Sequence, residues 1–338
     1  MSNREEHWSR RQFVSGLTLA GTAGLLGVPA QVPAEPPPET ARIRVASVPS
    51  VCLSPQYVAE EFLRVEGFTD VRYLSTEAGV PGAQQMGKGE IDISMNFAAP
   101  IVIALDAGAQ IVVLGGIHVG CFELIATKRV RSVPDLKGKT VGVFGLGSGQ
   151  HVFLSAMVAH VGLDPRKDVN FVVYPPAEAK KLLAEGKIDG YLGFPPDPQE
   201  LREKKVGHVV VNSAVDRPWS QYFCCMLTAN REFVARHPVA TKRALRAILK
   251  GNQVCALEPA RAARAFLQRG FTAREDHVVQ ALKEIPWTKW REFDPADTLR
   301  FYALRLHESG MIRSSPQKII AQGTDWRFLN ELKKELKG

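Results

Sequence analysis

The chain has 338 residues, of which 45% are hydrophobic and 23% are charged. A chain of this length can bury a sizeable core and exceeds one ordinary domain, so we expect two domains. No apolar run reaches the roughly 18 to 20 residues that a membrane span needs, which excludes a multi-span membrane protein. The formal net charge of +8 suits nucleic acid or a small anion. Basic residues are scattered among acidic ones without a recognition module, so no nucleic-acid partner is expected.

The first forty residues have the pattern of an export signal. Arg10 and Arg11 precede Phe13, a weakly apolar run follows from Leu17 to Val28, and a proline-rich stretch comes next. Paired arginines before a moderately apolar segment are typical of a twin-arginine signal peptide. We expect residues 1–30 to be that signal, residues 31–41 to be a linker, and the mature protein to lie in the periplasm. No cysteine stands near the expected cleavage point, so no lipid anchor is expected.

After the linker, short β-branched runs alternate with helical segments. In chain order the pattern predicts strands at 43–48, 71–74, 91–95, 111–115, 140–144, 171–174, 188–192 and 208–211. The intervening helices are predicted at 55–65, 83–88, 98–107, 151–161 and 177–184, and the sequence after Asn230 is mostly helical. Strand, helix and strand in this order indicate parallel sheets covered by helices on both faces.

The two series of elements contain an internal repeat. Gly89–Asp92 reads Gly-Glu-Ile-Asp, and 97 residues later Gly186–Asp189 reads Gly-Lys-Ile-Asp. The same offset places Phe97 on Phe194. Each copy has a glycine that ends a helix, a tight turn into a strand, and a phenylalanine beyond that strand. The repeat predicts two similar α/β lobes with a ligand between the carboxyl ends of their strands.

These features resemble the periplasmic solute-binding proteins of the nitrate, sulfonate and taurine type. The resemblance rests on Arg10-Arg11, on Ile43–Ala46, on the repeated turn, on Val133–Lys139 before a strand, and on the return after Tyr222. It implies a two-lobed, type II-like binding protein whose lobes are mainly parallel sheets flanked by helices, with a helical C-terminal region.

The resemblance also implies how the chain is divided and what it does. Lobe 1 would comprise residues 42–128 and 226–338, and lobe 2 residues 129–225. The crossovers between them would lie near Glu123–Lys128 and Gln221–Leu227. A monomer would capture a small molecule and deliver it to an ABC permease in the inner membrane.

Residues at the carboxyl ends of the expected strands are the candidates for the ligand site. The alternative for Phe97 and Phe194 is ordinary packing in the core. The alternative for His118 is a hydrogen-bonded structural role. Ser54 before Pro55 is first of all an expected helix N-cap. The full candidate set is Ser54, Asn96, Phe97, His118, Gly147, Ser148, Gln150, Phe194, Asp197, Trp219 and Tyr222.

The glycine-rich segment Gly145–Gly149 follows a strand and opens a helix. A dinucleotide fingerprint would need glycine at position 150 and an acidic residue after the next strand, where Gln150 and Tyr174 stand instead. NAD binding is therefore not expected, and no cofactor is assigned. The backbone N–H groups at the helix start, with the Ser148 hydroxyl, would make a cradle for a sulfonate or carboxylate. The alternative is a turn that only connects two elements.

Five cysteines occur in the expected mature chain. Cys224 and Cys225 are adjacent, and neighbours rarely bridge each other, so a disulfide framework is not expected. Cys255 lies on an apolar helix face and is expected in the core. Cys52, Cys121 and the adjacent pair fall at strand ends or crossovers and could converge beside His118, where thiols can hold a soft metal. The alternative is that they are small buried residues, and no metal is assigned.

The sequence therefore predicts a non-enzymatic, exported binding protein for a small anionic organic solute of an ABC importer. A pyrimidine-precursor protein of the thiamine pathway, for binding or synthesis, is one alternative, and a ligand-sensing periplasmic subunit is another. The ligand is left open between a sulfonate, an aromatic carboxylate and a pyrimidine.

Overall fold

The computed structural model describes residues 35–336. The expected signal peptide, with Arg10 and Arg11, lies outside the described residues. All described helices and strands belong to the unit that begins at Pro38. Within residues 35–336, no helix combines the length and apolar character that crossing a membrane requires.

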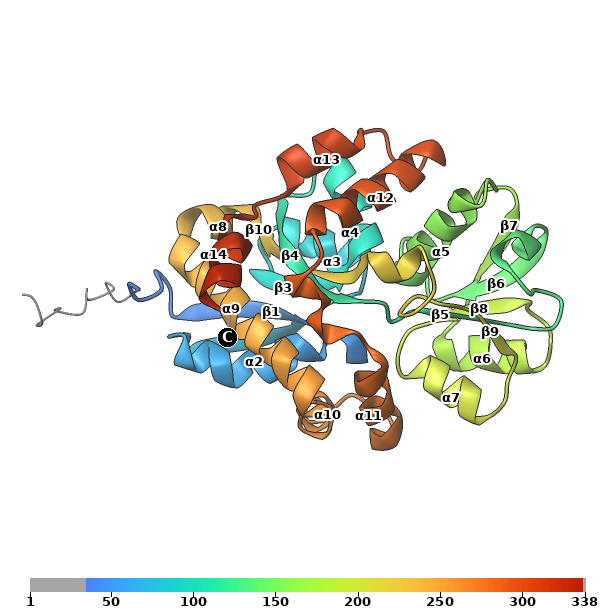
Figure 1. Ribbon diagram of the computed structural model, residues 1–338, viewed down its shortest axis with the longest axis horizontal. Helices are drawn as coiled ribbons and strands as arrows, with labels where there is room; N and C mark the ends of the chain where they lie inside the picture. The colour runs from blue at the N-terminus through green and yellow to red at the C-terminus, as the bar shows by residue number, and fades with distance from the viewer. Residues whose placement is uncertain (1–34, 337–338) are drawn as a thin grey trace, which may run out of the picture. The chain divides into compact units, whose positions relative to one another are not determined.

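The first sheet has five strands in the order β2-β1-β3-β10-β4 (Figure 1). β1 pairs in parallel with β2 and β3, whereas β10 runs antiparallel between β3 and β4. Its strands are β1 (Arg42–Ser47), β2 (Asp70–Ser75), β3 (Ile93–Phe97), β4 (Ile111–Val119) and β10 (Phe223–Asn230).

The second sheet repeats this plan in the order β7-β6-β8-β5-β9. β6 pairs in parallel with β7 and β8, and β5 runs antiparallel between β8 and β9. Its strands are β5 (Glu123–Ala126), β6 (Lys139–Val143), β7 (Val169–Val173), β8 (Gly190–Gly193) and β9 (His208–Asn212). The expected two-sheet α/β fold is confirmed, and each sheet is mixed because one antiparallel strand is inserted at its fourth position.

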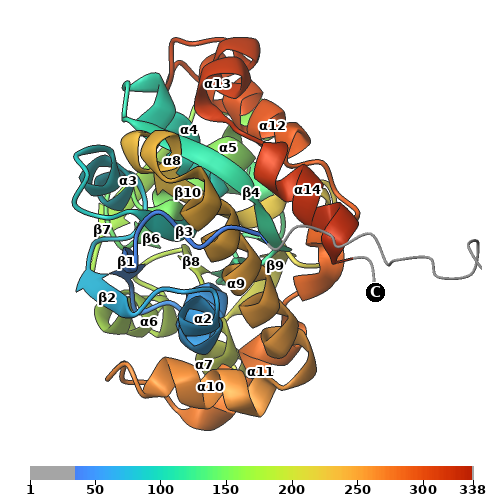
Figure 2. The same ribbon diagram turned by 90° about the vertical axis from the view of Figure 1, so that its left-hand side faces the viewer.

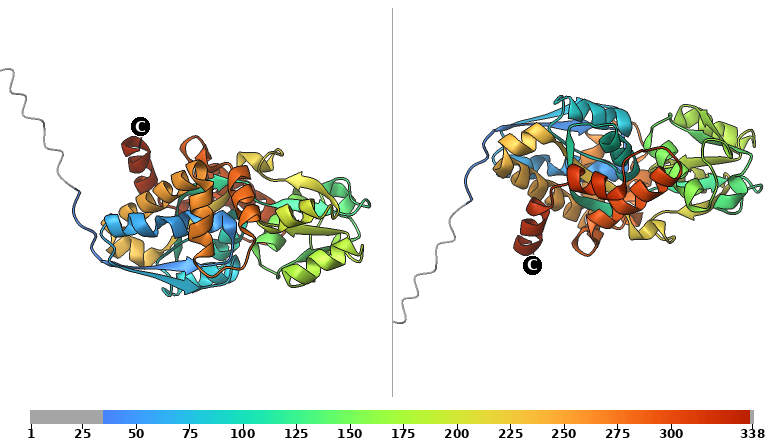
Figure 3. Two further views of the ribbon diagram at one scale, coloured as in Figure 1. Left: turned by 90° about the horizontal axis from the view of Figure 1, so that it is seen from below. Right: turned by 90° about the horizontal axis from the view of Figure 1, so that it is seen from above.

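Helices connect the strands and cover the sheets, as Figure 3 shows from below and above. The helices among the sheet strands are α2 (Ser54–Val65), α3 (Val80–Gly87), α4 (Ala98–Asp106), α5 (Gly149–His160), α6 (Pro176–Ala184) and α7 (Asp197–Glu203). The C-terminal helices are α8 (Arg231–Arg236), α9 (Pro238–Leu257), α10 (Pro259–Leu267), α11 (Glu275–Glu284), α12 (Pro295–Glu308), α13 (Pro316–Gly323) and α14 (Arg327–Glu335).

The long helix α9 lies beside α2 (Figure 2). Gly251 allows this approach, because a Cβ atom there would stand 2.3 Å from the Pro55 carbonyl oxygen of α2.

The expected N-cap role of Ser54 is wrong. A short 3₁₀ turn, Val51–Leu53, precedes α2, so Ser54 is already helical and its hydroxyl donates to the Val51 carbonyl at 2.6 Å.

The aspartate of the repeated Gly-x-Ile-Asp turn makes the same contact in both sheets. The Asp92 carboxylate accepts the backbone N–H of Arg44 in β1 at 2.7 Å, and the Asp189 carboxylate accepts that of Thr140 in β6 at 3.0 Å. A guanidinium pairs with each carboxylate, from Arg44 at Asp92 and from Arg129 at Asp189. Each aspartate therefore fastens the turn to the central parallel strand of its own sheet.

The chain passes between the sheets earlier than expected at the first crossover. Gly120–Phe122 forms that connection, and Glu123–Ala126 is strand β5 of the second sheet. The return runs from Asn212 to Phe223, ahead of β10. The sequence pattern did not predict β5 or β10. Each strand is buried along its whole length, so its sequence shows no alternation of polar and apolar residues.

We expect Asp92→Ala to lower the free energy of unfolding by about 1–3 kcal/mol, since it leaves the partly buried N–H of Arg44 without an acceptor. Asp92→Asn keeps an acceptor oxygen and should lose less. The exposed neighbour Glu90 supplies the control, Glu90→Ala, which should leave stability nearly unchanged. Urea unfolding measures all three, and equal losses for Asp92→Ala and Glu90→Ala would contradict the role of the turn.

Candidate functional site

The carboxyl ends of the two sheets meet through aromatic side chains. Phe97 is the last residue of β3, Phe194 follows β8, and their ring centroids are 5.8 Å apart. Phe122, on the first connection, lies 5.0 Å from Phe97 and 6.3 Å from Phe194. The predicted pair of phenylalanines thus lies in contact between the sheets, with ring planes tilted by 50°.

A small cavity lies beside these rings. Its volume is about 10 Å³, which is room for about one water molecule. The first turn of α4 forms one wall, and aromatic side chains form most of the rest. The lining residues are Phe97, Ala98, Ala99, Pro100, Gly120, Phe122, Phe153, Ser213, Trp219, Tyr222, Cys224 and Tyr302. The structure therefore shows this cleft in a closed form.

Backbone contacts between glycine-rich loops hold the same closure. The N–H of Val80 donates to the Gly147 carbonyl at 3.3 Å. Gly79 has φ +86°, and a Cβ atom there would stand 2.9 Å from the same carbonyl oxygen. A Cβ atom on Gly149 would stand 2.4 Å from Cδ2 of Phe97. Glycine is thus required on both sides for the loops to approach this closely.

The proposed anion cradle is internally hydrogen-bonded in this closed form. Ser148 caps α5 by accepting the His151 N–H, and the Gly147 N–H donates to His151 Nδ1 at 3.1 Å. Burial lowers the pKa of His151, which favours the neutral ring that can accept this bond. Gln150 differs, because its side chain is buried and its Nε2 donor has no hydrogen-bond partner among the described residues. One donor at the start of α5 is therefore left for an incoming acceptor.

Polar contacts between α7 and α11 form a second link between the two halves. The Arg202 guanidinium contacts Glu284 at 2.6 Å and the buried Glu123 at 3.2 Å. Gln199 donates to Glu284 at 2.8 Å, and Glu203 contacts His277 at 3.0 Å. Burial raises the pKa of Glu123 to about 7, against the opposing effect of Arg202. Opening the cleft would break the contacts of Glu284 with Arg202 and Gln199.

The remaining candidates of the second half have structural partners. The Asp197 carboxylate accepts the Tyr191 hydroxyl at 2.5 Å and pairs with Lys180 at 2.7 Å. Asp197 is absent from the lining of the small cavity, but with Phe194 it lines a separate pocket of about 420 Å³. Trp219 and Tyr222 do line the cavity, and both pack on Phe301 of α12, with Tyr222 stacked at 4.0 Å.

Asn96 and His118 are buried and do not line the cavity. The Asn96 amide donates to the Gly79 carbonyl at 3.2 Å and so holds one of the contacting loops. His118 is fully buried near the end of β4, with its ring 4.9 Å from that of Trp287. Burial opposes charge on both His118 and Cys52, but hydrogen bonds with Cys121, Cys225 and His118 favour the Cys52 thiolate, and contacts with Cys52 and Cys224 favour the charged ring of His118. The pKa of the Cys52 thiol is therefore lowered, and the pKa of His118 is raised.

Several lining residues escaped the sequence reading. Phe122 follows the fourth strand by three residues, Phe153 sits inside a predicted helix, and Tyr302 comes from the C-terminal helix α12. Phe122 could have been predicted, since it lies three residues beyond the end of a strand in the first half. Tyr302 had none, because only tertiary packing brings α12 to the cleft.

We expect Gly149→Ala to shift the protein toward an open form, since its Cβ would meet the Phe97 ring. Without that clash, alanine in α5 would stabilise the helix by about 0.5–1 kcal/mol. Gly145→Ala is the control, because a Cβ atom at Gly145 meets nothing within 4 Å. Small-angle scattering should show a larger radius of gyration for Gly149→Ala alone. An unchanged radius with raised stability would contradict the closed contact.

The chain is similar in structure to solved periplasmic binding proteins. It matches the alkanesulfonate-binding protein SsuA from Xanthomonas axonopodis pv. citri with a TM-score of 0.67 and 18% identity, over 82% of this chain and 96% of that one. It matches the periplasmic nitrate-binding protein NrtA from Synechocystis PCC 6803 with a TM-score of 0.72 and 16% identity, over 89% of this chain and 90% of that one. These likenesses confirm the periplasmic binding protein fold.

Sequence comparison gives distant relatives and a family. The nitrate/nitrite binding protein NrtA of Nostoc sp. PCC 7120 is 20% identical over an alignment of 296 residues that covers 74% of this chain and 67% of that protein. The nitrate import ATP-binding protein NrtC of Synechocystis sp. is 22% identical over 239 residues, or 64% of this chain, but the chain spans only 35% of its length. The model of the NMT1-like family matches residues 36–268. The chain belongs to the NMT1-like family.

Proposed function

We propose that this protein is an exported substrate-binding protein that captures a small anionic organic solute for an ABC importer. One observation carries the proposal. Two sheets with the same strand arrangement face each other at their carboxyl ends, around a closed cavity lined by aromatic side chains. Relatives named for nitrate, bicarbonate and alkanesulfonate binding support an anionic solute. Ligands of open parallel sheets bind at such ends.

Capture would work by closure of two lobes, one built around each sheet, with β5 (Glu123–Ala126) in the second lobe and β10 (Phe223–Asn230) in the first. Two connections, Gly120–Phe122 and the segment from Asn212 to Phe223, would take up the hinge rotation. A solute that touches both lobes stabilises the closed form by its extra contacts there. The permease of the importer would then distinguish loaded from empty protein by shape.

The cavity chemistry favours an organic anion over a bare inorganic one. No side chain lining the described cavity carries a formal charge, so the anion would be bound by dipoles and neutral donors. The first turns of α4 and α5 meet there through the contact of Phe97 with Gly149. Helix N-termini attract anions, and the free Nε2 donor of Gln150 adds a neutral hydrogen bond. The aromatic walls suit the apolar or aromatic body of a sulfonate or carboxylate.

Mass spectrometry of small molecules released from the purified protein tests the proposal directly. We expect a sulfonate or carboxylate at about one molecule per chain, and calorimetry should confirm that it binds. A released phosphorylated pyrimidine, or turnover of any added substrate, would overturn it in favour of the thiamine-pathway alternative.

The aromatic pair should carry part of the affinity. Phe97→Ala and Phe194→Ala should each weaken solute binding by about 1–3 kcal/mol through lost apolar contact. Leu63, buried in α2 away from the cavity lining, is the matched control: Leu63→Ala should cost about 2–5 kcal/mol of stability and leave affinity unchanged. If both phenylalanine variants behave like Leu63→Ala, the rings belong to the core and the site is not between the sheets.

We propose further that Arg10 and Arg11 direct export by the twin-arginine route, so that the protein works as a monomer in the periplasm. Replacing both arginines by lysine should leave the precursor in the cytoplasm, because that route reads the paired guanidinium groups. Cell fractionation with antibody detection measures this outcome. Normal export of the double variant would refute the twin-arginine route while leaving solute binding untouched.

A further inference from the structure

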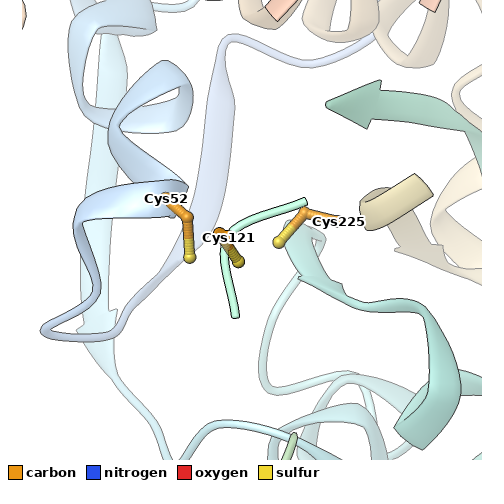
Figure 4. A group of neighbouring side chains, drawn as sticks. All are labelled: Cys52, Cys121 and Cys225. Atoms are coloured by element: carbon orange, nitrogen blue, oxygen red, sulfur yellow. The ribbon is translucent and has the colours of Figure 1, made fainter. Parts of the chain in front are cut away.

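Four cysteine side chains converge at the carboxyl end of the first sheet. Cys52 lies in the turn after β1, Cys121 on the first connection, and Cys224 and Cys225 at the start of β10. The sulfur atoms of Cys52, Cys121 and Cys225 all lie within 4.8 Å of one another (Figure 4). Cys121 and Cys224 have their sulfurs 2.8 Å apart. Segments about 70 and 100 residues apart in the chain thus deliver thiols to one point.

The spacing suits coordination of a single ion. Thiolates about 2.3 Å from a zinc ion stand about 3.8–4.0 Å from each other, so the observed separations need only small shifts to bind one. Figure 4 shows the three side chains coming from different segments with their sulfur atoms turned toward a shared space. Soft thiolate ligands select zinc and monovalent copper over hard cations.

His118 lies beside Cys52, outside the set of sulfur atoms that share the 4.8 Å spacing, so its ring would have to turn toward them to bind the same ion. It sits in β4 directly opposite Cys225 of β10. Its Nδ1 lies 3.2 Å from the Val119 carbonyl, whereas its Nε2 is fully buried and has no hydrogen-bond partner within residues 35–336. A metal-bound histidine has this arrangement, with one ring nitrogen held by a carbonyl and the other on the ion. Burying the ring for packing alone would leave that nitrogen uncompensated.

We propose that Cys52, Cys121 and Cys225 form a buried site for one soft metal ion, zinc or monovalent copper, with His118 as the fourth ligand. Each coordinating thiol gives up its proton to solvent when the ion binds. Cys224 provides the entry path, because it lines the cavity between the sheets and its sulfur touches that of Cys121. Cys255 is fully buried in α9 and lies outside the group, so it serves as an internal control.

Metal titration of the full mature chain, reduced and freed of metal, tests the site. Cobalt, as a probe for zinc, should bind at one equivalent and give thiolate-to-cobalt absorption in the near ultraviolet. Monovalent copper should compete with a coloured copper chelator, also at one equivalent. Elemental analysis of the protein isolated from cells then distinguishes which of the two ions it holds.

Matched variants locate the ligands. Cys52→Ser and Cys225→Ser should each weaken binding by at least about 100-fold, since loss of outer partners alone costs 10–100-fold. His118→Gln should weaken it by a similar factor, and Cys255→Ser should bind like the unchanged chain. Added zinc should raise the unfolding temperature of the unchanged chain and of Cys255→Ser, but not of Cys52→Ser.

Three results would overturn the proposal. The first is cobalt uptake without thiolate absorption in the unchanged chain, a result that stands even if every variant misfolds. The second is equal metal affinity in Cys52→Ser, Cys225→Ser and Cys255→Ser. The third is a Cys121–Cys224 disulfide in protein isolated without reductant, seen as a mass lower by two hydrogens, because it consumes one ligand. None of these results bears on solute binding, which is measured separately.

Discussion

The architecture depends on where the chain changes sheets. β4 ends at Val119 and β5 begins at Glu123, opposite the last residue of β8, so the chain leaves one carboxyl edge and enters the other. Three residues between these strands can span at most about 14 Å. The return has the same property, because Phe223 at the start of β10 pairs with Val119 at the end of β4. The two carboxyl edges therefore have to face each other.

This constraint explains why aromatic residues gather where they do. Parallel strands are buried on both faces, so only the residues at their carboxyl ends remain to meet the other half. Phe97 and Phe194 hold those positions, and Phe122 occupies the short connection between them. In the closed form they pack on one another with little space left between them. The same rings therefore fill most of the space between the two sheets at this point.

Local pattern was enough to predict the repeated half-sheets, because their turns are encoded within a few residues. Asp92 and Asp189 each bind a backbone N–H of the adjacent central strand, 48 and 49 residues earlier in the chain, so the same turn recurs in both sheets. The antiparallel strands β5 and β10 were beyond such reasoning, since their partners are 64 to 136 residues away and both faces are buried. The same holds for Tyr302, which reaches the cavity only through packing of α12. The N-cap prediction for Ser54 was wrong because a 3₁₀ turn precedes the helix, so the helix begins at Ser54 itself.

The inserted strand β10 also joins the two candidate sites. Adjacent residues on a strand point to opposite faces, so Cys224 reaches the cavity while Cys225 reaches Cys52 and His118. The pairing of β10 with β4 is irregular around Cys225, and such bulges bend a strand and re-aim its side chains. Cys224 and Cys225 directly follow Phe223, so a movement of the return segment would reach them before the rest of β10. The four cysteines therefore stand where the chain leaves the first sheet and returns to it, and an ion bound to Cys121 and Cys225 would tie the outgoing connection to the returning strand.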